Sequence, residues 1–94
     1  MSYRLIYSQT SRDLIRNIHP ELKSIIRSRI KELVENPYVG KRLEKELSGY
    51  FSLRVKRFRI LYKIQNKNQT VEIHYVGHRK DVYQLFKEYA VLET

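Results

Sequence analysis

The stretch 50–64 constrains the fold most, because its alternation of apolar and polar side chains changes phase midway. Before the change the apolar positions are odd, Leu53 and Val55. After it they are even: Phe58, Ile60, Tyr62 and Ile64. A shift of one residue moves the whole apolar set of a strand to the other face of its sheet. The chain must therefore turn or bulge near Lys56 and Arg57.

A hairpin is the simplest geometry that satisfies this change of phase. Side chains alternate between the two faces of a strand, so Ser52 and Arg54 lie opposite the apolar set of the first strand. Arg59 and Lys63 lie opposite the apolar set of the second strand. We therefore predict that Arg54 and Arg59 both project from the face of the sheet that is opposite the core.

The remaining elements follow from periodicity and from turn residues. Residues 3–8 predict a strand, and a helix is expected to start near Thr10. A second helix, with apolar side chains at three- and four-residue spacing, is expected to end at Asn36-Pro37. Residues 37–49 are read as a charged connector and residues 71–76 as a strand. Residues 81–89 predict a short helix whose apolar stripe is Val82, Leu85, Phe86 and Tyr89.

These elements predict an α+β fold in the order β-α-α-β-β-β-α. Its small, twisted, mainly antiparallel sheet has two N-terminal helices on one face and a short C-terminal helix. The opposite face is expected to be solvated and basic. With 94 residues, the chain is expected to form one domain over residues 1–94.

The composition excludes several classes of site. The chain has no cysteine, so a disulfide scaffold and a cysteine nucleophile are ruled out. Its three histidines have no spacing typical of metal ligands, and we expect neither a metal nor a cofactor. No apolar run is long enough to span a membrane, and none resembles a signal sequence. We therefore expect a cytoplasmic protein that does not bind a membrane.

The net charge of +9 is unevenly distributed along the chain. Residues 41–63 carry a net charge of +6, from two glutamates and eight basic side chains: Lys41, Arg42, Lys45, Arg54, Lys56, Arg57, Arg59 and Lys63. Such a field favours a polyanion, either a nucleic acid or an acidic protein segment.

The sequence resembles the RelE/ParE toxin superfamily in four segments that together cover nearly the whole chain. They are Asn36-Pro37, residues 43–50, Leu53-Arg54-Val55 with Phe58-Arg59-Ile60-Leu61-Tyr62, and residues 76–83, which read Val-Gly-His-Arg-Lys-Asp-Val-Tyr. Each segment alone is weak, but their combination in this order and spacing is fairly specific. The family fold, a twisted sheet with two N-terminal helices and one C-terminal helix, agrees with the elements predicted above.

In the RelE branch, the resemblance implies a metal-independent endoribonuclease, or mRNA interferase, that cleaves mRNA in the ribosomal decoding site. The 2′-hydroxyl of the RNA attacks the adjacent phosphate and leaves a cyclic phosphate and a 5′-hydroxyl. Such a protein must orient the sugar and stabilise charge on the phosphoryl oxygens. Guanidinium groups suit that task because they are always charged and bind phosphate through a planar fork.

The resemblance also implies which residues form the site. Arg59 matches the family's strand arginine, and Arg79 matches the arginine after the last strand. Tyr83 matches the aromatic residue of the C-terminal segment, which is suited to stack on a base or donate a proton. Arg54 stands where many members carry a lysine that acts as general base.

Arginine is a poor base because it is effectively never deprotonated. Ser52 also departs from the family pattern, since it replaces a second basic position. The base is therefore Lys56, His78 or Tyr83, or proton removal is less localised. Imidazole side chains commonly transfer protons near neutral pH, so His78 is one of these candidates.

Two other functions fit the same fold. One is a ParE-like toxin that binds and poisons DNA gyrase, although such members generally lack the arginine–tyrosine set. The other is an inactive relative that binds only its antitoxin and operator. The resemblance implies a cognate antitoxin, the ribosome and mRNA as partners, with operator DNA bound only through the antitoxin complex.

Overall fold

The structure, a computed structural model, describes the backbone of residues 2–93 and the side chains of residues 2–88. Its main elements are β1 (Arg4–Tyr7), α1 (Gln9–Arg16), α2 (Pro20–Glu32), β3 (Phe51–Val55), β4 (Phe58–Gln65), β5 (Thr70–His78) and α3 (Val82–Glu93). The connector after α2 contains two 3-10 turns and a short edge strand: η1 (Pro37–Val39), β2 (Lys41–Arg42) and η2 (Lys45–Leu47). The predicted order β-α-α-β-β-β-α is confirmed, while β2 was not predicted.

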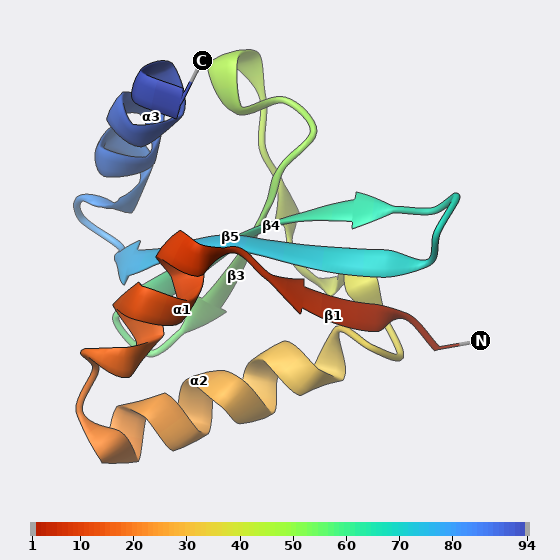
Figure 1. Ribbon diagram of the computed structural model, residues 1–94, viewed down its shortest axis with the longest axis horizontal. Helices are drawn as coiled ribbons and strands as arrows, with labels where there is room; N and C mark the ends of the chain where they lie inside the picture. The colour runs from red at the N-terminus through yellow and green to blue at the C-terminus, as the bar shows by residue number, and fades with distance from the viewer. Residues whose placement is uncertain (1, 94) are drawn as a thin grey trace.

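The sheet has five strands in the order β1-β5-β4-β3-β2. β1 runs parallel to β5, and every other pair is antiparallel. Figure 1 shows α1 and α2 on one side of the sheet and α3 on the other. The helical pair carries the chain from β1 on the edge to the strands that follow, as a parallel pairing requires.

The predicted hairpin at the change of phase is confirmed. Val55 pairs with Phe58, so β3 and β4 are joined by the two residues Lys56 and Arg57. Lys56 has a φ of 55°, a left-handed conformation that tight hairpin turns require. The turn reverses the chain and brings both apolar sets to the same face of the sheet.

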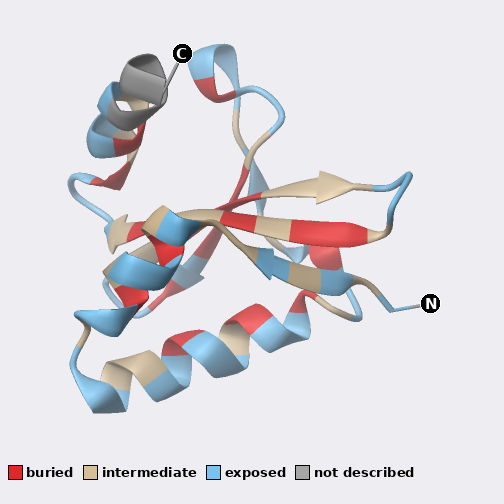
Figure 2. Ribbon diagram, viewed as in Figure 1, coloured by how far each residue is buried: buried red, intermediate tan, exposed pale blue. Residues whose placement is uncertain are grey.

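The main core lies between that face and the two N-terminal helices. The helices contribute Ile15, Ile26, Ile30 and Leu33, and the strands contribute Leu53, Val55, Ile60, Tyr62 and Ile73, among others. In Figure 2 the buried positions of α2 follow one stripe along the helix, on the side that faces the sheet. α1 begins at Gln9, one residue before the predicted start near Thr10, because the Ser8 hydroxyl caps it by accepting from the Ser11 amide at 3.0 Å.

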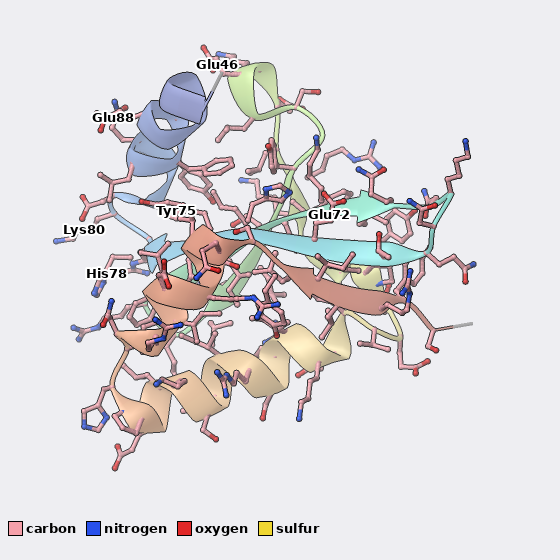
Figure 3. All side chains as sticks on the ribbon, viewed as in Figure 1. Glu46, Glu72, Tyr75, His78, Lys80 and Glu88 are labelled. Atoms are coloured by element: carbon pink, nitrogen blue, oxygen red, sulfur yellow. The ribbon has the colours of Figure 1, made fainter. Side chains whose placement is uncertain are left out.

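The expectation of a wholly solvated opposite face was wrong. A second apolar cluster of Leu47, Leu61, Val82 and Phe86 covers part of it. Figure 3 shows Tyr75 between the sheet and α3, where its ring lies 5.4 Å from that of Phe86. The predicted stripe of α3 was right for Val82 and Phe86 but wrong for Leu85, which is 44% exposed. The Tyr89 side chain lies outside the described residues.

Tyr62 connects the core to the loop that follows α2. Its side chain is fully buried, and its hydroxyl donates to the Pro37 carbonyl at 2.7 Å and accepts from the Gly40 amide at 3.1 Å. Burial raises the pKa of Tyr62 to about 12, although the Gly40 amide acts in the opposite direction. A side chain on Gly40 would overlap the Tyr62 hydroxyl, so this contact explains why the loop needs glycine there.

We expect Tyr62→Phe to lower the free energy of unfolding by about 1–3 kcal/mol, because it leaves the Pro37 carbonyl and the Gly40 amide without their partner. Tyr38→Phe is the matched control, since Tyr38 is exposed and its hydroxyl donates to the exposed Asn66 side chain. Urea unfolding at neutral pH measures both variants. An effect of equal size in the two would contradict this account.

The raised pKa of Tyr62 predicts a loss of stability at alkaline pH. Between pH 10 and about 12 the unfolded chain releases the Tyr62 proton while the folded chain retains it. Stability should therefore be retained below pH 10 and fall as pH rises through this window. Tyr62→Phe should flatten that fall, whereas Tyr38→Phe should not.

Candidate active site

Two arginines face one another on the side of the hairpin opposite the main core. Arg54 of β3 and Arg59 of β4 project from the same face, as predicted, and the structure adds that they are direct cross-strand partners. Side chains at such positions lie about 5 Å apart at their Cβ atoms, and like charges there destabilise the pair of strands. The two like charges face each other next to the tight turn at Lys56 and Arg57. A bound anion would offset their repulsion.

Arg59 is the more constrained of the two side chains. Arg54 is exposed, whereas Arg59 is partly buried and its Nε is fully buried without a hydrogen-bond partner. Among residues 2–88, no carboxylate forms an ion pair with either guanidinium. A buried donor without a partner is expensive, and an acceptor from outside the protein would remove that cost.

Tyr83 lies over the same face of the sheet. The first turn of α3 carries it, and its hydroxyl lies 3.1 Å from the Ser52 hydroxyl, where either group can donate. Ser52 is buried and comes two residues before Arg54 on β3, so it points to the same face. The burial of Val82 and Phe86 on either side of Tyr83 fixes the helix that presents it.

The end of β5 completes this face. Gly77 pairs with Arg59, so no side chain fills the place beside the guanidinium. A Cβ at Gly77 would lie 3.2 Å from the Val82 Cγ2 atom, a tight contact that would press on α3. Arg79 is exposed, and its amide donates to the Arg57 carbonyl at 2.8 Å, which fastens this segment to the hairpin turn.

His78 and Lys56 are placed elsewhere. His78 pairs with Phe58, which belongs to the core side of the sheet, and their rings lie 4.6 Å apart. Both line a cavity of about 460 Å³ with Lys56, Arg57 and Leu22, the last from α2. Figure 3 shows His78 and Lys80 at the end of β5, where the chain turns towards α3. The structure thus joins Arg54, Arg59 and Tyr83 on one face, with Arg79 at its end.

The sequence pattern did not reveal the role of Ser52. It stood out only because it replaces a basic residue of the family pattern, whereas the structure makes it the hydrogen-bond partner of Tyr83. Within the described part of the chain, no three His, Asp or Glu side chains are grouped as metal ligands. Likewise, none of the described helices is long and apolar enough to cross a membrane.

We expect Ser52→Ala to loosen Tyr83 without unfolding the protein, because alanine fits the same space and removes only one hydroxyl. The free energy of unfolding should fall by about 1 kcal/mol, the usual contribution of one hydrogen bond. Thermal unfolding measures that change. NMR can monitor rotamer averaging of the Tyr83 ring, which should increase in Ser52→Ala and not in a Ser48→Ala control. Unchanged averaging in Ser52→Ala would show that the hydroxyl contact does not hold the ring.

Comparison with known proteins places the chain in a family. Residues 7–83 match the family described as the ParE toxin of type II toxin–antitoxin systems, parDE. The toxin RelG of Mycobacterium tuberculosis (strain ATCC 25618 / H37Rv) is 35% identical over 86 residues, covering 89% of this chain and 99% of that protein.

Solved structures agree with this placement. The RelBE2 toxin–antitoxin complex from Mycobacterium tuberculosis contains a chain with a TM-score of 0.78 and 32% identity, covering 84% of this chain and all of that one (100%). A mutant of the E. coli toxin RelE in the free state has a TM-score of 0.75 at 16% identity over 89% of this chain and 93% of its own, and so supports the fold alone. The chain belongs to the RelE/ParE family of type II toxin–antitoxin toxins.

Proposed function

We propose that this toxin is a metal-independent endoribonuclease that cleaves mRNA in the decoding site of the ribosome. The observation that carries the proposal is the Arg54–Arg59 pair, with its buried and unpartnered Arg59 Nε and the Tyr83 hydroxyl over the same face. A gyrase-binding surface has no need for two opposed guanidiniums beside a phenol, whereas phosphoryl transfer has.

The chemistry follows from these groups. The RNA 2′-hydroxyl attacks the adjacent phosphorus, the bond to the 5′ oxygen breaks, and a 2′,3′-cyclic phosphate and a 5′-hydroxyl form. Arg54 and Arg59 bind the non-bridging oxygens, where negative charge gathers in the transition state. Tyr83 donates its proton to the leaving 5′ oxygen and regains one from water.

The proton of the attacking hydroxyl goes to water in this scheme. Neither arginine accepts a proton, and His78 and Lys56 line a cavity with Leu22 of α2 rather than the arginine face. Two guanidiniums that stabilise the developing charge reduce the need for a strong base. Arg79, exposed at the end of this face, binds the phosphate of a neighbouring nucleotide.

The same proposal includes a cognate antitoxin. Several solved structures similar to this chain are described as toxin–antitoxin complexes, among them RelBE2 from Mycobacterium tuberculosis and RelE–RelB from Pyrococcus horikoshii. An antitoxin of acidic and apolar character would neutralise the basic face and cover the arginine pair. Operator DNA would be bound through that complex.

The second candidate function is gyrase poisoning, favoured by the description of the matching family as ParE toxins. Expression of the toxin without antitoxin separates the two. An mRNA interferase arrests translation first, whereas a gyrase poison induces the SOS response while translation continues. Full growth of the expressing cells would instead indicate an inactive relative that only binds its antitoxin.

Primer extension on a defined mRNA tests the proposal in a reconstituted translation system. We expect cuts within the codon in the decoding site when ribosomes are present, and none when the same mRNA and toxin are mixed without them. Folded, antitoxin-free toxin that leaves the mRNA intact on ribosomes would overturn the proposal.

A further inference from the structure

A second concentration of positive charge lies away from the arginine face, where α1 and α2 approach each other. A cavity of about 490 Å³ opens between these helices and the end of β1. Its lining consists of Tyr7 and Ile15 with five cations: Arg12, Arg16, Lys23, Arg27 and Lys31. We call this cavity the helical cleft. Figure 1 shows both of its helices on the side of the sheet opposite α3.

The cations of the helical cleft follow the helical repeat. Arg12 and Arg16 are four residues apart on α1, and Lys23, Arg27 and Lys31 are four apart along α2. Residues at this spacing lie above one another on one face of a helix, and like charges there cost about 0.2–0.5 kcal/mol a pair. Three such pairs therefore line one cavity, an arrangement that helix stability alone disfavours.

The protein supplies little negative charge to offset these cations. Among residues 2–88, only Arg16 of the five has an acidic partner, Asp13 at 3.4 Å, and both side chains are largely exposed. Lys23 reaches across the cleft, where its Nζ donates to the Arg16 carbonyl at 3.1 Å. Surface ion pairs of this kind contribute little, so the cleft keeps almost all of its positive field.

Tyr7 adds a hydrogen-bond donor to the helical cleft. Burial raises the pKa of Tyr7, and the nearby Arg27 and Arg12 lower it less than burial raises it. The phenol therefore keeps its proton at neutral pH beside two guanidiniums. A neutral donor within a ring of cations matches the oxygens of a phosphate.

We propose that the helical cleft binds the sugar–phosphate backbone of a folded RNA, at a site separate from the Arg54–Arg59 pair. An RNA backbone is recognised mainly through cations and hydrogen-bond donors, which this cleft provides from two helices. An acidic protein segment would also need apolar area to bury, and only Ile15 and the Tyr7 ring provide it there.

The helical cleft and the arginine pair lie on opposite sides of the sheet, so they engage different RNA segments. The substrate strand occupies the arginine face, and the helical cleft holds the structured RNA that surrounds that strand. This inference extends the proposed function of the toxin, but its readout is binding rather than cleavage. The two ideas can therefore fail separately.

The test compares two double variants that remove the same charge. Arg12→Gln with Arg27→Gln alters the helical cleft, and Arg4→Gln with Lys67→Gln removes two exposed cations elsewhere. All four side chains are exposed, so both proteins should fold, which thermal unfolding checks. The probe is purified small ribosomal subunits, with affinity measured by filter binding over a range of salt concentrations.

We expect the cleft variant to bind subunits at least about tenfold more weakly, with a salt dependence smaller by about one to two phosphate contacts. The control should stay within about threefold of the unaltered toxin. Equal losses in the two variants would overturn the proposal, as would a cleft variant that keeps its subunit affinity and loses affinity for purified antitoxin. Intact binding by a toxin that cuts no mRNA would instead count against the proposed nuclease.

Discussion

Replacing Arg59 with alanine is expected to slow mRNA cleavage on ribosomes by about 10²- to 10³-fold, the usual effect of removing one preorganised donor to a developing oxyanion. The same change should leave the free energy of unfolding unaltered or raise it by up to about 1 kcal/mol. It removes one of two like charges that face each other across the strands, together with a buried Nε that has no partner.

A large loss of activity without a loss of stability makes this result diagnostic. Single-turnover cleavage of a programmed ribosome measures the rate, and urea unfolding measures stability. Lys67→Ala is the matched control, because Lys67 is exposed in the turn between β4 and β5 and its loss should alter neither quantity. A slow Arg59→Ala variant that is also strongly destabilised would assign the arginine a structural role instead.

Replacing Phe86 with alanine is expected to release α3 from the sheet. Phe86 is 1% exposed, and its ring lies 4.9 Å from that of Tyr50 and 5.4 Å from that of Tyr75. Removing a buried phenylalanine costs about 3–5 kcal/mol. A helix of 12 residues is marginal without packing, so the loss should fall on α3 itself.

Hydrogen exchange and cleavage together measure this release. Amides 82–93 should lose protection while those of α2 keep it, and cleavage should fall because Tyr83 leaves the arginine face. Leu85→Ala is the control on the same helix, since that side chain is 44% exposed. Full protection of α3 in Phe86→Ala would show that other contacts anchor the helix.

The hairpin was predictable because the two-residue period of a strand leaves few alternatives once its phase changes. From that change the sequence predicts both the turn near Lys56 and the shared face of Arg54 and Arg59, and the structure confirms both. The edge strand β2 was not predicted, because two charged residues carry no periodicity. Their strand conformation depends on pairing with Phe51 and Ser52, which lie beyond the next turn of the chain.

The candidate site was less predictable than the fold, since local patterns do not tell which side of the sheet a late helix covers. On β4, Leu61 is the apolar residue between Arg59 and Lys63 on the face opposite the main core. Its packing with Val82 and Phe86 decides where α3 lies. That packing brings Tyr83 to Ser52. His78 seemed suited to proton transfer by its imidazole chemistry, but its place in the alternation of β5 puts it beside Phe58.

A single 2′-deoxynucleotide placed at the cut site of a ribosome-bound mRNA tests the central claim most directly. In the proposed mechanism the RNA supplies the nucleophile and Arg54 and Arg59 stabilise the charge, so removing that one hydroxyl should abolish cleavage at that position and at no other. Cleavage that persists at the deoxynucleotide would mean that water or a protein group is the nucleophile, and would contradict the account.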